Sequence, residues 1–279
     1  MKLNAQAFRD SEHKRITLLG MSGVGKTTLA AKLPKNRWFH YSGDYRIGTQ
    51  YLNEPIIDYL KQEAMKVKSL ETLLRSDSIY IRNNITIDNL SVVSHFLGKI
   101  GNSELGGLSL AEFKRRQALH RQAEIASMLD VPDFIHKVAA IYGYQHFLND
   151  AGGSLCELEC PQVLETLAEY TLILYIQTTP ELEKLLQQRA QAEPKPLYYR
   201  EKFLDEHLIK FMSIKGYQNA EQIIPDEFVS WVFPCLFQSR VPRYQSIADH
   251  YGYTIPAQAI AEVNNETDFI DLISDILAK

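Results

Sequence analysis

A glycine-rich stretch near the start of the chain has the residue types and spacing needed to hold a chain of phosphates. Gly20 to Thr28 matches the pattern G-x-x-x-x-G-K-[ST], the P-loop. Its glycines let the backbone turn tightly and direct N–H groups at phosphate oxygens. The residues that we expect to bind nucleotide are Gly20, Ser22, Gly23, Val24, Gly25, Lys26, Thr27 and Thr28.

Two side chains of this motif suit specific tasks. Lys26 supplies a mobile positive charge for the β- and γ-phosphates of ATP, and the Thr27 hydroxyl can ligate Mg²⁺. ATP and Mg²⁺ are therefore the predicted cofactors. The alternative is an accidental glycine-rich turn. The flanks argue against it, because 16–19 is a short apolar run typical of a buried strand and 27–33 can form a helix that ends before Pro34.

Two aspartates follow predicted strands and could complete such a site. Asp44 comes after the run 38–41 and is placed to orient or deprotonate an acceptor hydroxyl. Asp150 ends the run 144–150, as a Walker-B acid does, and is a candidate ligand of Mg²⁺, directly or through water. The alternative for each is an ordinary turn carboxylate.

The elements that must position these residues alternate between strand and helix. A fourth apolar run lies at 171–176, and helical patterns cover 161–169 and 180–192. This alternation predicts an α/β P-loop NTPase three-layer fold with a parallel sheet, whose ligands gather at the carboxyl ends of the strands.

A large helical insertion accompanies the predicted core. We assign 1–50 and 143–279 to the nucleotide-binding core, and 51–142 to a mainly helical insertion on the substrate or partner side. Helical patterns lie at 56–68, 111–129 and 132–142, a short β-like piece at 79–81 interrupts them, and 200–237 is helical again.

Composition limits the classes of protein that the chain can represent. It has 279 residues, with 45% apolar and 23% charged side chains, which excludes a disordered, collagen-like or coiled-coil chain. Its net charge of −4 disfavours a nucleic-acid partner, although Lys114, Arg115, Arg116 and Arg121 form a local basic cluster. The three cysteines do not form a disulfide framework, and no apolar run is long enough to span a membrane. We expect a cytoplasmic protein without membrane contact, and the sequence leaves its oligomeric state open.

Several segments resemble shikimate kinase and its relatives among the P-loop small-molecule kinases. Beyond the P-loop, the segments that carry the resemblance, in the family's order, are 41–47, 150–154, 172–182, 194–197 and 240–249. Three features depart from the family. Ser42 stands where the family has the first aspartate of a pair, Lys195 stands where an arginine is usual, and the helical stretch 51–142 is longer.

The resemblance implies roles for several cationic residues. Together with Lys26 and Asp44, Arg189 is expected to be catalytic, on a lid from Arg189 to Arg200 that also carries Lys195. The side chains expected to hold an anionic group of the substrate are Arg46, Arg240 and Arg243.

The function expected from these residues is ATP-dependent phosphoryl transfer to a hydroxyl of a small, anionic metabolite. One alternative is a P-loop ATPase or switch protein that acts on a protein partner through the helical insertion. Another is a nucleotide or nucleic-acid end kinase that uses the basic cluster at 114–121 as a groove. No G-protein motif of the type Asn-Lys-x-Asp occurs, which argues against a GTPase.

Overall fold

One parallel sheet forms the centre of the molecule. The computed structural model describes residues 4–278, and within them five strands lie in the order β2-β3-β1-β4-β5. Their bounds are β1 Arg15–Leu19, β2 Trp38–Ser42, β3 His146–Asp150, β4 Leu172–Gln177 and β5 Gly252–Pro256. All neighbouring strands pair in parallel. This confirms the predicted fold class and four of the strands.

The three central strands are buried on both faces. In β3 every residue is buried, and in β1 and β4 only one terminal residue is partly exposed. A strand covered on both sides needs apolar residues in succession rather than in alternation, which is why these runs are readable in the sequence. The register aligns Leu18 with Asp150 and Ser42 with Asp150, so the ends of β1, β2 and β3 meet at one edge.

The fifth strand was not predicted. β5 begins at a glycine, ends at a proline and is mostly half-buried, so it lacks an apolar run. Gly252 is required by close packing, since a Cβ there would lie 2.2 Å from the carbonyl oxygen of Ile173 in β4. Any larger residue at this position would force the edge strand off the sheet.

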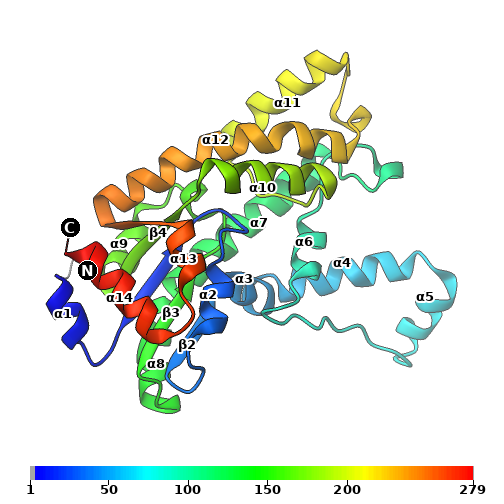
Figure 1. Cartoon of the computed structure of the whole chain (residues 1–279). Helices are drawn as coiled ribbons and strands as arrows, with labels where there is room; N and C mark the ends of the chain where they lie inside the picture. The colour runs from blue at the N-terminus through cyan, green and yellow to red at the C-terminus, as the bar shows by residue number, and fades with distance from the viewer. Residues whose placement is uncertain (1–3, 279) are drawn as a thin grey trace.

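Helices surround the sheet and extend to one side of it (Figure 1). Those that follow the strands or cover them are α1 Ala5–Asp10, α2 Lys26–Lys32, α3 Gly43–Arg46, α8 Val131–Tyr142, α9 Pro161–Tyr170, α10 Pro180–Ala192, α13 Ala257–Glu262 and α14 Glu266–Leu277. Those that lie partly or wholly beyond it are α4 Asn53–Met65, α5 Lys68–Arg75, α6 Ser91–Leu97, α7 Leu110–Leu129, α11 Glu201–Lys215 and α12 Pro225–Tyr251. A short π-helix, η1 Ile47–Tyr51, and three short 3-10 helices complete the elements: η2 Ser103–Leu105, η3 Leu155–Glu157 and η4 Ala220–Gln222.

Within residues 4–278, the apolar side chains form three clusters rather than one. The largest joins the sheet to its covering helices. A second lies between α11, the start of α12 and the residues near Ile100 and Phe113. A third joins η1, α4, α6 and α7. Met128, Val131 and Val138 belong to the sheet's own cluster. The division between core and insertion at residue 142 stays a prediction.

The segment between β2 and β3 sends out an arm formed by α4 and α5, which projects away from the sheet (Figure 1). No residue of α5 is buried. The β-like piece predicted at 79–81 is wrong, because those residues form no strand and lie in the loop that returns from the arm. Within residues 4–278, no helix combines the length and the apolar character needed to cross a membrane.

Candidate active site

The P-loop joins β1 to α2 and is shaped by three glycines with positive φ. Gly20, Gly23 and Gly25 have φ of 145°, 88° and 101°, a region that residues with a Cβ rarely adopt. Lys26 is buried, and its Nζ donates to the carbonyl oxygens of Gly20 at 2.9 Å and Met21 at 3.2 Å. The loop therefore holds its own lysine at the place where a phosphate would be bound.

A threonine and an aspartate lie together beside the P-loop. The Thr27 hydroxyl donates to Oδ2 of Asp150 at 2.6 Å, and His40 Nε2 lies 3.5 Å from the same oxygen. Burial opposes the charge of Asp150, but neighbouring His40, Lys26 and Thr27 together lower its pKa. A hydroxyl beside an ionised carboxylate is a donor set that suits Mg²⁺.

The donor set fits a metal that binds together with nucleotide phosphates. Among residues 4–278, no group of three or more His, Cys, Asp or Glu side chains could hold a metal by itself. Mg²⁺ usually takes one or two protein ligands and completes its shell with water and phosphate. Thr27 and Asp150 would provide those protein ligands, with Lys26 facing the phosphates.

Asp44 lies across from this pair, at the start of α3. Its carboxylate faces the turn after β3, since a Cβ on Gly152 would lie 3.0 Å from Asp44 Oδ1. Burial, reinforced by the negative charge of Asp150 and opposed by Lys26, raises the pKa of Asp44 to about 6. A carboxylate with this pKa is a competent general base near neutral pH.

A second carboxylate, Glu124 of α7, reaches the same turn from the other side. A Cβ on Gly152 would lie 2.6 Å from Glu124 Oε1, so only glycine leaves room for both acids. Glu124 is fully buried and accepts a hydrogen bond of 2.6 Å from Ser154 through Oε2, while Oε1 has no hydrogen-bond partner. Burial raises the pKa of Glu124 to about 7.

Sequence reasoning missed Glu124, although α7 contains a signal. Gln117, His120, Glu124 and Ser127 recur at helical spacing and are all buried. Such a stripe is typical of a solvated helix face. Its burial here follows from the packing of α7 against η1, α3 and α9, which the sequence does not reveal.

A cavity of about 550 Å³ adjoins the P-loop. Gly23, Val24 and Gly25 line one side, and the beginning of α10 and α13 line the other through residues such as Leu182 and Ala257. Most of its lining is small or apolar, which suits the flat face of a nucleotide base. The wall formed by α13 comes directly after β5 in the chain. Because β5 was not predicted, the residues of this wall were not part of the predicted site.

The three arginines expected to hold substrate already have partners within the protein. Arg46 Nε donates to Asp130 at 2.8 Å, and its guanidinium lies over the Phe134 ring at 5.0 Å. Arg240 is buried and donates to the carbonyl oxygens of Gly153 at 2.9 Å and Tyr198 at 2.7 Å.

Arg243 lies elsewhere. Its Nη1 is 3.5 Å from Glu159, and it lines a separate cavity with Cys156 and Cys160 that contains no P-loop residue. The guanidinium groups of all three arginines therefore hold elements of the protein together, and their role in substrate binding stays a prediction.

The segment expected to form a lid is helical in its first part and anchored in its last. Arg189 lies in the last turn of α10 and is exposed, and Lys195 is exposed beside Glu193. Arg200, in contrast, forms ion pairs with Glu157 and Glu159. Arg200 is therefore not free to face phosphate.

The basic cluster at 114–121 is mostly neutralised. Lys114 pairs with Glu201 and Asp205 of α11, and both Arg115 and Arg116 pair with Glu112. Arg121 differs, because among residues 4–278 it has no ion-pair partner and donates only to the carbonyl oxygen of Leu158.

The fold and the site define a P-loop protein of the nucleotide-binding α/β class, on the evidence of the sheet order and the loop geometry. No protein-family profile matches the chain, and no curated protein matches it. Among solved structures, it is similar to a shikimate kinase from Bacteroides thetaiotaomicron, with 16% identity over 95% of this chain and 99% of that one, at a TM-score of 0.40. It is also similar to a shikimate kinase from Acinetobacter baumannii in complex with shikimate, with 17% identity over 98% of this chain and 94% of that one, at a TM-score of 0.40.

Proposed function

We propose that the protein transfers the γ-phosphoryl group of ATP to a hydroxyl of a small, anionic metabolite. The observation that supports this most is the position of Asp44. Its carboxylate lies beside that of Glu124 at Gly152, and the charges of Lys26 and Asp150 both act on it. A carboxyl group at this place with a pKa of about 6 suits the removal of a proton from an acceptor hydroxyl.

The residues divide the work of transfer among them. Bound ATP with Mg²⁺ supplies the phosphoryl group and neutralises part of its charge. Lys26 faces the phosphates, Thr27 and Asp150 hold the metal, and Asp44 accepts the proton of the attacking hydroxyl. Arg189, exposed on α10, is available to stabilise the charge that spreads over the transferring oxygens.

Arg121 is the arginine best suited to hold an anionic group of the acceptor. It lies on α7 one helical turn before Glu124, and it is partly buried without an ion-pair partner among the described residues 4–278. A partly buried guanidinium without an ion-pair partner is stabilised by a carboxylate or phosphate, because bidentate hydrogen bonds would satisfy its remaining donors.

A screen of acceptors tests the proposal. The protein is incubated with Mg-ATP and separate pools of sugars, sugar acids, nucleosides and cyclic hydroxy acids, and products are identified by mass. We expect a phosphorylated product from an anionic pool, absent with Lys26→Ala and with Asp44→Asn. Hydrolysis that no pool changes would refute transfer to a metabolite. Transfer only to nucleosides or added oligonucleotides would favour the end-kinase alternative.

One observation favours the ATPase or switch alternative. The arm of α4 and α5 exposes Val67, Leu70, Leu73 and Tyr80, and Tyr80 is 78% exposed. An arm of this kind could contact a protein partner. Deleting residues 67–80 should leave phosphoryl transfer unchanged if the metabolite kinase is correct. Loss of a partner-stimulated ATPase would instead support the switch.

A further inference from the structure

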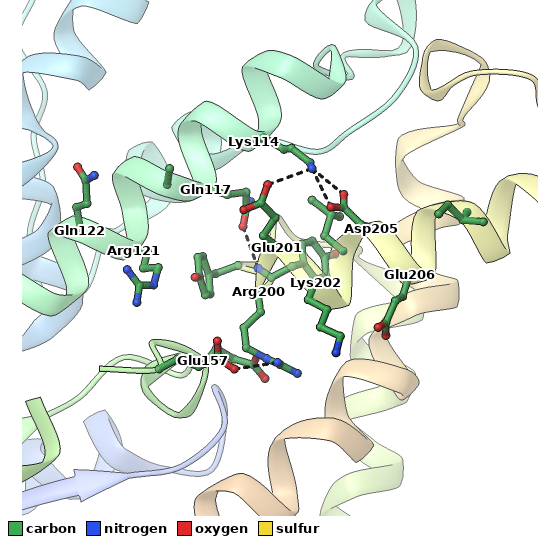
Figure 2. Close-up of a pocket in the computed structure, with 16 residues that line it drawn as sticks. Lys114, Gln117, Arg121, Gln122, Glu157, Arg200, Glu201, Lys202, Asp205 and Glu206 are labelled. Atoms are coloured by element: carbon green, nitrogen blue, oxygen red, sulfur yellow. Dashed lines mark hydrogen bonds and ion pairs between the residues drawn. The ribbon is translucent and has the colours of Figure 1, made fainter. Parts of the chain in front are cut away.

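A large cavity lies between α7 and α11, outside the residues assigned above to phosphate and metal. It measures about 830 Å³, near the upper end of the ~300–1,000 Å³ typical of ligand pockets. One face of α7, the loop at 198–200, the turn with Glu157 and Glu159, and the beginning of α11 line it. Figure 2 shows Lys114 reaching across from α7 to Glu201 and Asp205 of α11.

Arg121 of α7 connects this cleft with the proposed transfer site, because it lines the cleft and lies one helical turn before Glu124. Glu124 lies beside Asp44, Arg121 precedes it by one turn, and Lys114 lies ten residues before Glu124. With a rise of 1.5 Å per residue, Arg121 is about 5 Å and Lys114 about 15 Å along the helix from Glu124. In Figure 2, Arg121 points from α7 toward the turn that carries Glu157. The hydroxyl of an acceptor would contact Asp44, and its anionic group would contact Arg121. Any further part of the acceptor would therefore lie in this cleft.

The rigid parts of the lining are ion pairs and hydrogen bonds. Lys114 is held by two acids of α11, and Arg200 by Glu157 and Glu159. Gln117 donates to the carbonyl oxygen of Leu197 at 3.2 Å and accepts from the backbone N–H of Tyr199 at 2.8 Å. These two hydrogen bonds hold the backbone at 197–199 against α7. Donors and acceptors thus alternate around the cleft in a fixed arrangement.

Such a lining favours hydroxyl groups over other chemistry. Apolar surface from Tyr198, Tyr199, Ala118, Leu204 and Ile209 lies beside these polar groups, and the carbon faces of a sugar ring suit such surface. A charged extension that reached Lys114 or Arg200 would have to compete with ion pairs that are already formed. A hydroxyl both donates and accepts, so it can bridge paired acids and bases without breaking them.

We propose that this cleft is a second acceptor subsite that binds a sugar unit attached to the anionic head of the substrate. The inference rests on the proposed phosphotransfer and makes the acceptor a glycosylated hydroxy acid rather than a single small ring. The lobe formed by α11 and the start of α12, with its own apolar cluster, then serves to build one wall of the subsite.

Matched pairs of acceptors test the subsite. The protein with Mg-ATP is given gluconate against lactobionate and maltobionate, and glucuronate against cellobiouronate, and kcat/KM is measured from the phosphorylated product. Two or more added hydrogen bonds should raise kcat/KM for the glycosylated acid by about tenfold over its single-unit partner.

Variants that alter only the cleft sharpen the test. Ala118→Trp fills it from an exposed position of α7, and Ala140→Trp places the same side chain on an exposed position of α8 as a control. Ala118→Trp should remove the tenfold preference and leave the single-unit acid unchanged, and Ala140→Trp should change neither. Lys202→Ala, an exposed change on the cleft wall, should weaken the preference in part.

The outcomes separate the two proposals. Equal or better transfer to the single-unit acids, or the same preference in Ala118→Trp as in Ala140→Trp, overturns the subsite and leaves phosphotransfer standing. No phosphorylated product from either member of any pair, together with no product in the wider screen, overturns the proposed function and the subsite with it.

Discussion

Replacing Glu124 by glutamine should change the pH dependence of stability in a defined direction. The glutamine keeps nearly the same shape, and its carbonyl can still accept the hydrogen bond from Ser154. What it removes is the ionisation of a fully buried carboxyl group.

The magnitude follows from the pKa of Glu124. Burial raises that pKa from an ordinary 4.5 to about 7, so the folded chain keeps a proton that the unfolded chain releases. The resulting stability is fully present below the unfolded pKa and is lost as pH rises through the folded pKa. Between about pH 5 and about pH 8, wild type should therefore lose about 2 to 3 kcal/mol relative to Glu124→Gln.

Denaturant unfolding of both proteins at the two pH values measures this difference. Subtracting the variant removes titrations that both proteins share. Glu165→Gln, on an exposed position of α9, is the matched control and should give the same difference at both pH values. A wild-type minus Glu124→Gln difference that stays constant from acid to alkaline pH would refute the buried, protonated state of Glu124.

Four further changes test the site. Lys26→Ala should abolish ATP turnover and leave the circular dichroism spectrum unchanged, because its Nζ contacts only the P-loop carbonyls. In wild type the transfer rate should rise with pH through about 6, as Asp44 loses its proton, and Asp44→Asn should lose transfer while a fluorescent ATP analogue still binds. Gly152→Ala should lower stability by about 1 to 3 kcal/mol in urea unfolding and disable transfer, because its Cβ meets both Glu124 and Asp44. Arg189→Ala should lower kcat more than ATP affinity in steady-state kinetics, and an unchanged kcat would exclude it from the transition state.

The sequence predicted the parts of the fold whose residues depend on local constraints. The P-loop is readable because its glycines must adopt positive φ, and β1, β3 and β4 are readable because burial on both faces requires continuous apolar runs. β5 could not be predicted, because this edge strand from Gly252 to Pro256 requires neither positive φ angles nor a continuous apolar run.

The roles of charged residues were harder to predict, because they depend on which partner the fold provides. Nothing near Arg240 in the sequence shows that the carbonyls of Gly153 and Tyr198 take its donors. Glu124 looks like a solvated helix residue until α7 is packed against the turn after β3. The positions of Asp44 and Asp150 near one another could be predicted, because Asp150 ends β3 and Asp44 comes shortly after β2, and both strands end at the same edge of the sheet.

The fate of the γ-phosphate tests the central claim most directly. The protein is incubated with a dialysable metabolite extract and ATP labelled in its γ-phosphate, and the label is followed into small molecules, inorganic phosphate and protein. The account predicts label in an anionic, hydroxylated small molecule with wild type, and none there with Asp44→Asn, which keeps Lys26 and the Thr27–Asp150 pair. Label found only in inorganic phosphate or in protein, and to the same extent with Asp44→Asn, would contradict the assignment of this protein as a metabolite kinase.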